Sequence, residues 1–522
     1  MGFRLSLSWG CLALLACGVT FARGASPYLP LGISPEIDRK IERVLVLGDK
    51  PVRRRPIPAA VVLDALPKAC AQDRALCEDV RAYLKRFMHT GKITHLRASA
   101  AATDGDSEAV LPNGHGLHVD DPWEVRAHAY YQPNDHLLIS AGAIVREDET
   151  IPTDSMISFG SEYAQLDFGY RDHWLSPLND SASLISTQAP TMPSATLSNY
   201  APISPLGLTY EIFQAEMSRQ EGIIADGGTT SGRPSLAGVQ LGIEPAAGYS
   251  LAVNRITQYG GGARGGGSFS DFVDAFTTTS NEHGVSEVNR VASITSTILF
   301  QAQIPFAVHL EYAGEDNAFE GPYRLGATNM SLGLDFPRLW RRYDLRYELS
   351  EWQNSWYVHH LYPDGLTNRG HVLGHWFGDN RQFGDAIGGH SHSLRAGLRL
   401  DSGDYIQATY RNLAYDSDWA GSRERVSYEQ MHMIELDYST VWAGRAVDAQ
   451  LHVGRDVFGE SFARLGASFD FVRISPRFSG VIEQGDELRS DSNAEVFVEM
   501  GAHRSEVREV MLDLGPNVIS GP

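Results

Sequence analysis

The sequence predicts an all-β transmembrane barrel of about 18 antiparallel strands, preceded by a small N-terminal periplasmic helical bundle. Two observations carry this prediction. Segments in which apolar and polar residues alternate recur along most of the chain, and short turns and long loops join them in turn. A soluble β-sandwich has no reason to place its long loops at one end, whereas a membrane barrel has short periplasmic turns and long surface loops.

The stretch from Tyr343 to Tyr415 shows one unit of this pattern. Tyr343–Ser350 alternates between apolar and polar residues, and a long segment rich in glycine, histidine and aspartate follows from Leu361 to His390. Alternation resumes at Leu394–Leu400, and the tight turn Asp401–Asp404 leads into the next strand. Aromatic residues gather near the strand ends, as expected for rings at the level of the lipid headgroups.

We predict 18 strands, an even number as bacterial barrels have. The predicted strands are Lys92–Ala102, Pro122–Tyr131, His136–Val145, Met156–Phe168, Pro205–Glu216, Pro234–Glu244, Tyr249–Tyr259, Glu287–Gln301, Pro305–Ala313, Thr328–Leu339, Arg342–Val358, His392–Asp401, Asp404–Tyr415, Ser427–Val441, Ala446–Asp456, Ser461–Arg473, Pro476–Glu483 and Asn493–His503.

The chain has 522 residues and a formal net charge of −20. Phosphate binding needs basic surface, so this balance argues against nucleic acid as a partner. It also provides no polybasic patch for anionic lipid. Beyond the N-terminus, no segment has the ~18 consecutive apolar residues that a transmembrane helix needs.

The first residues read as a secretory signal, residues 1–24. Arg4 supplies the charge, Leu5–Phe21 is largely apolar, and Ala22–Gly24 supplies small residues for cleavage. As an alternative, Leu14–Cys17 resembles a lipobox, which would place a lipid on Cys17. We expect the helical bundle to occupy residues 25–91 and the barrel to occupy residues 92–522.

Within the bundle, apolar residues recur at helical spacing from Ser34 to Met88. Cys70 and Cys77 would lie ~10 Å apart along one continuous helix, too far for a disulfide. A turn at Ala71–Arg74 would bring them together, and we expect that bridge in an oxidising periplasm. The alternative is a pair of reduced core thiols.

The densest run of polar and aromatic residues is Tyr163–Pro177. We place Arg171, Asp172 and His173 at a strand end on the periplasmic side, where Arg171 and Asp172 would lock the barrel rim or hold the long connection that follows. The connection that follows, Pro177–Ser204, is long for that side, and we expect it to fold inward as a plug.

Motifs for enzymatic chemistry are missing. The sequence contains neither a G-x-S-x-G elbow nor a Walker A loop. Gly260–Gly267 reads as a flexible surface loop. Asp335, Asp344 and Glu348 are the carboxylates that we considered for glycoside cleavage, but no spacing ties any two of them into a catalytic pair. We therefore predict no enzymatic activity and no cofactor.

Several histidines surround the long loop. His390 and His392 share a strand face, and three possible metal ligands precede them: His371, His375 and Asp379. The H-x-H spacing permits a metal but does not indicate one. Solvated loop histidines are the alternative that we prefer, and we predict no metal site.

The long loops offer the chemistry of a sugar site. Flat aromatic rings hold the C–H faces of sugars, and planar amide, carboxylate and guanidinium groups bind their hydroxyls. The predicted polysaccharide-binding residues are Tyr362, Asp364, Trp376, Asp379, Asn380, Arg381, Tyr323, Arg324, Trp419 and Arg423.

The order of these parts resembles the Wzi family of outer-membrane capsule-assembly proteins. The resemblance is carried by the helical segment Ser34–Met88, the stretch Tyr163–Pro177 and the downstream hairpins that end in Asn493–His503. Its most specific piece is a G-x-x-D-x-W-x-x-P pattern. That pattern is formed here by Gly169, Asp172, Trp174 and Pro177. Family members often carry Trp-Trp-Gly-Pro where this chain has Trp-Leu-Ser-Pro.

The resemblance implies an 18-stranded barrel with a periplasmic bundle, and a lectin-like role that tethers capsular polysaccharide through extracellular loops. We therefore expect a monomeric protein of the bacterial outer membrane that binds capsular or exopolysaccharide and contacts outer-membrane lipid and lipopolysaccharide. The alternatives are a porin-like channel for sugars or other small solutes, and a hydrolase embedded in the barrel.

Overall fold

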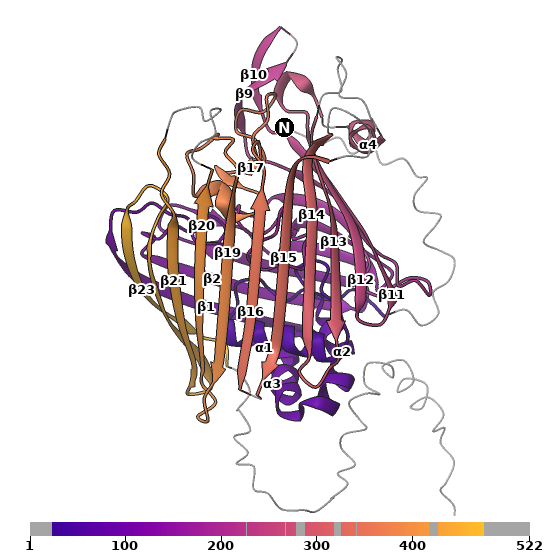
Figure 1. Ribbon diagram of the computed structural model, residues 1–522. Helices are drawn as coiled ribbons and strands as arrows, with labels where there is room; N and C mark the ends of the chain where they lie inside the picture. The colour runs from indigo at the N-terminus through magenta and orange to yellow at the C-terminus, as the bar shows by residue number, and fades with distance from the viewer. Residues whose placement is uncertain are drawn as a thin grey trace, which may run out of the picture. The chain divides into compact units, whose positions relative to one another are not determined.

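The computed structural model describes residues 23–225, 227–266, 268–277, 288–317, 325–340, 342–416 and 426–473. Within this part of the chain, 18 antiparallel strands form a closed ring (Figure 1). The ring closes where β1 pairs with β23, from Arg97 opposite Asp470 to Gly105 opposite Phe462.

The ring strands are β1 (Gly91–Gly105), β2 (Trp123–Asn134), β3 (Leu137–Val145), β5 (Ser155–Ser161), β6 (Ala164–Tyr170), β7 (Pro193–Ser198), β8 (Thr209–Glu216), β11 (Ser235–Ala246), β12 (Tyr249–Tyr259), β13 (Asn289–Phe300), β14 (Phe306–Asn317), β15 (Leu325–Leu339), β16 (Tyr343–Trp352), β19 (Gly389–Arg399), β20 (Tyr405–Tyr415), β21 (Met431–Trp442), β22 (Arg445–Arg455) and β23 (Ser461–Asp470). The remaining strands lie in the connections: β4 (Thr150–Ile151), β9 (Gln220–Ala225), β10 (Gly228–Gly232), β17 (Thr367–Asn368) and β18 (His371–Val372).

The predicted number of strands is confirmed, but one stretch of the prediction is wrong. The single strand expected at Met156–Phe168 is the hairpin β5–β6, and β7 was not predicted at all. The turn of this hairpin, Glu162–Tyr163, contains neither glycine nor proline, so the usual turn signal is missing. The last two predicted strands, Pro476–Glu483 and Asn493–His503, lie outside the described residues.

Short turns and long loops lie at opposite ends of the barrel. The long connections are residues 106–122, 146–154, 171–192, 217–234, 260–288, 318–324, 353–388 and 416–430, and they leave the same end; the exception is 199–208, which lies at the other end. The other end carries turns as short as residues 135–136, 247–248 and 443–444. This sorting is typical of a barrel that spans an outer membrane.

The wall of the barrel is apolar outside and polar inside. Outward side chains such as Met330 and Leu465, each 63% exposed, alternate with buried inward side chains such as Ser331 and Arg464. Trp340 and Trp442 stand at the short-turn ends of their strands and are 76% and 68% exposed. This pattern suits strands with one face towards lipid and aromatic rings at the interface. No helix in the described ranges is long and apolar enough to cross a membrane.

Three helices gather at the short-turn end: α1 (Pro35–Leu47), α2 (Ala59–Gln72) and α3 (Arg74–Leu84) (Figure 1). Gln301, beyond the end of β13, donates to the carbonyl of Val46 at 2.7 Å, and Arg338 of β15 donates to the carbonyl of Gln72 at 3.1 Å. The bundle therefore packs on the end of the barrel opposite the long loops.

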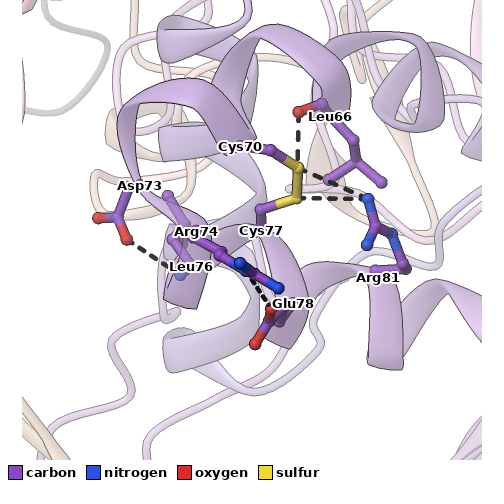
Figure 2. The surroundings of a disulfide bond; sticks show 8 residues. All are labelled: Leu66, Cys70, Asp73, Arg74, Leu76, Cys77, Glu78 and Arg81. Atoms are coloured by element: carbon purple, nitrogen blue, oxygen red, sulfur yellow. Dashed lines mark hydrogen bonds and ion pairs between the residues drawn. A yellow bond between two sulfur atoms is a disulfide. The ribbon is translucent and has the colours of Figure 1, made fainter. Parts of the chain in front are cut away.

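A disulfide joins Cys70 of α2 to Cys77 of α3, with Cα atoms 5.1 Å apart (Figure 2). The two helices are separate because the chain turns at Asp73, whose side chain accepts from the N–H of Leu76 at 3.1 Å and caps α3. The turn brings the two sulfur atoms together, which one continuous helix would not do.

Replacing both Cys70 and Cys77 by serine is expected to lower the stability of the bundle by roughly 2–3 kcal/mol, because the unfolded chain loses a short closed loop. The barrel should stay closed, since its ring pairs independently of the bundle. Limited proteolysis measures the effect, with faster cleavage at α2 and α3 and an unchanged barrel fragment as the expected result. Equal cleavage rates with and without the bridge would contradict it.

Candidate functional site

The barrel lumen is entered from the long-loop end by residues 171–192, here called the plug. Every residue of the plug is buried. The inward folding predicted for Pro177–Ser204 is therefore confirmed for residues 177–192, but residues 193–198 form the wall strand β7, and the predicted side is wrong. Because β5 and β6 form a hairpin, β6 runs towards the long loops, and Arg171, Asp172 and His173 leave it at that end.

The inner wall holds the plug through carboxylates that accept backbone hydrogen bonds. Glu348 of β16 accepts from the N–H groups of Asn179 (2.8 Å), Asp180 (2.8 Å) and Ser181 (3.0 Å). Glu311 of β14 accepts from the hydroxyl of Ser176 at 2.7 Å. Such charge-assisted bonds are stronger than neutral ones, so they fix the path of the plug across the lumen.

Asp180 ties the plug to β19 and β20, the strands next to β16 in the wall. Its carboxylate pairs with Arg411 at 2.7 Å and with Arg395 at 3.8 Å, and it accepts from the hydroxyl of Ser393 at 2.9 Å. Burial alone would raise the pKa of Asp180, but the two guanidinium groups outweigh burial and hold its pKa below the usual value. Asp180 is therefore ionised and bound to the wall at neutral pH.

Helix α1 meets the plug from the other end. Glu42 of α1 accepts from the side-chain amide of Asn179 at 2.7 Å and pairs with Arg55 at 3.0 Å. On the same helix, Arg39 pairs with Asp335 at 2.6 Å and Asp344 at 2.7 Å. The lumen is thus filled from both ends, and buried ion pairs join the helix, the plug and the wall.

These pairs also account for the carboxylates considered above for glycoside cleavage. Asp335 and Asp344 are held by Arg39, and Glu348 is held by Arg346 at 2.7 Å, each of them 3% exposed or less. Carboxylates neutralised in this way hold structure together and do not face a substrate.

Asp154 is a buried acid in the turn before β5, near Asp172 of the plug. Burial and the neighbouring charge of Asp172 raise the pKa of Asp154 to about 8. Asp172 accepts from the hydroxyl groups of Thr191 and Thr153 (2.5 Å and 3.0 Å) and lies 3.1 Å from Nε2 of His115. Asp154 is therefore protonated at neutral pH, beside an ionised partner.

Asp154→Asn is expected to stabilise the protein at pH 8 and to leave it unchanged near pH 4. An unfolded Asp loses its proton near pH ~3.9. The native state keeps that proton up to about pH 8. Native stability therefore falls as pH rises between these values, by ~1.4 kcal/mol per pH unit at most, and asparagine removes this loss. Asparagine also tolerates the positive φ of 56° at this position.

The measurement for Asp154→Asn is the melting temperature in detergent at pH 4, 6 and 8, with the exposed Asp106→Asn as the matched control. The gain should appear at pH 6, grow at pH 8 and be absent from the control. A gain of equal size at pH 4 would show that the charge of Asp154 is not its cause.

The long loop 353–388 folds into the mouth of the barrel above the plug. Four predicted sugar-binding residues on it are buried: Tyr362, Trp376, Asn380 and Arg381. The hydroxyl of Tyr362 donates to the carbonyl of Gly260 at 3.1 Å, and Asn380 donates to the carbonyl of Val110 at 3.2 Å. These residues hold neighbouring loops together, and protein covers their side chains.

The other predicted binding residues are placed differently. Asp379 accepts from the N–H of Val372 and the side-chain amide of Gln188, both at 2.8 Å, and so links the loop to the plug. Asp364 is half-buried at the outer part of the loop. Four more lie outside the described residues: Tyr323, Arg324, Trp419 and Arg423. A role for any of these residues in polysaccharide binding stays a prediction.

The histidines are spread over both faces of the wall. His375 is buried in the mouth, where burial lowers its pKa to about 3 and its Nε2 lies 3.2 Å from the hydroxyl of Ser391. His390 and His392 point outward, and His392 contacts the hydroxyl of Tyr347 at 2.8 Å. In the described part of the chain, no three His, Cys, Asp or Glu side chains are grouped to hold a metal ion.

The loop end carries an aromatic surface that the sequence reasoning missed, formed by Phe383, Tyr428 and Phe458 and here called the aromatic platform. Phe383 is 56% exposed and Phe458 is 47% exposed. Tyr428 contacts both segments: its ring centroid is 5.9 Å from that of Phe458, and its hydroxyl accepts from the N–H of Gln382, the residue before Phe383, at 3.1 Å. Two exposed rings therefore belong to segments that Tyr428 joins at the mouth.

Polar groups lie beside this platform. Arg455 pairs with Glu429 at 2.8 Å, and both side chains are about half exposed. Arg455 also donates to the carbonyl of Gly459 at 2.8 Å, next to Phe458. Exposed rings with flanking guanidinium and carboxylate groups suit a saccharide, which presents C–H faces and hydroxyls together. No periodicity in the loops marks which aromatic residues face outward, so only composition pointed to this region.

Comparisons with known proteins agree with this architecture. The family model described as capsule assembly protein Wzi matches residues 101–458. Among solved structures, the chain is similar to Wzi of Escherichia coli, with 13% identity, a TM-score of 0.62, and coverage of 86% of this chain and 99% of that one. That E. coli protein is described as a carbohydrate-binding β-barrel of the outer membrane that is involved in group 1 capsule assembly.

Two further structures match less well. Acinetobacter baumannii OccAB4 is 12% identical with a TM-score of 0.43, covering 72% of this chain and 96% of that one. Pseudomonas aeruginosa OccK3 (OpdO) is 11% identical with a TM-score of 0.44, covering 72% and 94%. No curated protein matches the chain significantly. Since the family match spans well over half of the 522 residues, the chain belongs to the capsule assembly protein Wzi family.

Proposed function

We propose that this protein is a lectin-like, non-enzymatic barrel of the bacterial outer membrane that binds capsular or exopolysaccharide at the cell surface and helps to assemble or anchor it. Membership of the family supports the role in capsule assembly. The E. coli relative, described as carbohydrate-binding, has the same fold at 13% identity. The proposal also includes a signal peptide at residues 1–24, a monomeric barrel, and contact with outer-membrane lipid and lipopolysaccharide.

One observation carries the proposal: bare aromatic rings face outward at the mouth of a barrel whose lumen is filled. A porin needs a water-filled path through the barrel. Here the buried pairs of Asp180 with Arg411 and of Arg39 with Asp335 lie in that path. A filled barrel offers its loop surface for binding, and the exposed Phe383 and Phe458 supply the rings.

The first test is deletion of the gene and complementation with the full chain. Loss of attached polysaccharide, with the polymer recovered from the medium, is the expected result. Loss of polysaccharide synthesis would instead contradict a role in attachment.

The second test is binding of the purified protein, in detergent, to polysaccharide isolated from the same strain. We expect saturable binding and no shortening of the polymer during incubation. Shortening of the polymer would favour the embedded hydrolase and overturn the non-enzymatic part of the proposal.

A further inference from the structure

Helix α4 (Phe269–Thr277), in the long connection 260–288, lies on the outside of the barrel (Figure 1). Ala237 of β11 and Tyr259 of β12 point away from the lumen, yet they are only 0% and 3% exposed. They are buried because they pack in one cluster with Ala275 of α4, with Phe272 and Phe276 against it. The helix therefore covers the outer face of the wall at its long-loop end.

Arg255 of β12 holds the end of this helix. Its guanidinium donates to the carbonyl of Phe276 at 3.2 Å and to that of Ala275 at 3.4 Å. A cation at the C-terminus of a helix is favourable because the last carbonyls have no partners within the helix. Arg255 thus fixes α4 to the wall through backbone oxygens, without a carboxylate.

A second arginine lies on the same outward face. In the pairing of β12 with β13, Thr257 stands opposite Arg290 and Arg255 stands opposite Ala292, so the two arginines are diagonal neighbours. The Nε and Nη2 atoms of Arg290 are buried and make no hydrogen bond to any described residue. No carboxylate in the described ranges pairs with either arginine. Two adjacent cations, of which Arg290 has two unsatisfied donors, call for an anion with several acceptor oxygens.

The surroundings of these arginines are those of a lipid surface. Towards the middle of the barrel, Val253 and Ile294 share the outward face and are 55% and 47% exposed. The arginines stand above this apolar band, towards the long loops, where the headgroups of the outer leaflet would lie. An acyl chain would contact the apolar residues while its headgroup reaches the guanidinium groups.

We propose that Arg255, Arg290 and α4 form a binding site for a phosphate group of lipopolysaccharide. The site rests on the outer-membrane location in the proposed function and is separate from the aromatic platform. Arg290 supplies the charge-assisted hydrogen bonds to the phosphate. Arg255 adds positive charge and holds α4 in place against the wall.

Native mass spectrometry of the full chain in detergent tests this site, with diphosphorylated lipid A as the probe. Arg290→Gln should bind it at least ~10-fold more weakly than the unchanged protein, since charge-assisted bonds to phosphate are lost. Arg290→Lys should keep most of the affinity because it keeps the charge. The matched control is Arg219→Gln, which removes an exposed loop arginine paired with Glu221 at 2.8 Å.

Equal affinity in the unchanged protein and Arg290→Gln would overturn the site, and so would an equal loss in Arg219→Gln. Phosphatidylglycerol binding as tightly as lipid A, with the same dependence on Arg290, would show a general anionic-lipid site and overturn the assignment to lipopolysaccharide. Arg290→Gln should still bind polysaccharide, so failure of this site and failure of the proposed function are distinguishable. Heat-modifiable mobility on gels verifies that each variant is folded.

Discussion

Replacing Glu348 by alanine is expected to release the plug and make the barrel conduct ions. Glu348 accepts three backbone N–H groups, from Asn179, Asp180 and Ser181, and also pairs with Arg346. Alanine would leave these donors and the Nε of the buried Arg346 without their acceptor. Breaking a buried pair in this way costs about 3–5 kcal/mol. The strands should survive, because their pairing does not depend on the plug.

Conductance in planar bilayers measures this effect. The unchanged protein should show little current, and Glu348→Ala should show frequent or steady openings. Glu351→Ala is the matched control, since Glu351 lies on the same strand but is exposed on its outward face. Large steady conductance of the unchanged protein would contradict a filled lumen, and a closed Glu348→Ala would show that other contacts hold the plug.

The second large effect is expected at the aromatic platform. The double variant Phe383→Ala/Phe458→Ala should weaken binding of a short fragment of the capsular polysaccharide by about 10-fold or more. The reason is that each ring contributes roughly 1 kcal/mol of contact with a sugar face, and 1.4 kcal/mol corresponds to tenfold in affinity. Both rings are exposed, so their removal should leave the stability of the fold nearly unchanged.

Isothermal titration with an oligosaccharide fragment is the appropriate measurement, because a long polymer binds at several points and hides the loss of one contact. Trp340→Ala removes an even more exposed ring, 76% accessible, at the short-turn end and serves as the control. If the double variant and the control bind equally well, the platform is not the sugar site, and the residues predicted in loops 318–324 and 416–425 become the next to test.

A membrane barrel can be recognised from its sequence because the lipid-facing and lumen-facing sides of each strand differ in polarity. Apolar and polar residues therefore alternate along the chain. Along β16, buried and outward residues alternate from Tyr343 to Trp352, as predicted. Alternation does not reveal the turn of the β5–β6 hairpin. It continues on both sides of Glu162–Tyr163, and neither of these residues is a typical turn residue. One missed turn reversed the direction of β6 and placed the plug at the wrong end.

Residue patterns alone establish the fold class, the sorting of most long and short connections, and the inward course of residues 177–192. Each of these depends on local composition and spacing, which the backbone periodicity of strands translates directly into structure. Which loop residues meet solvent depends instead on three-dimensional packing. Trp376 is buried and Phe383 is exposed although they lie seven positions apart in one loop. Loops have no fixed period, so contacts with the plug and neighbouring loops, distant in sequence, determine which rings are covered.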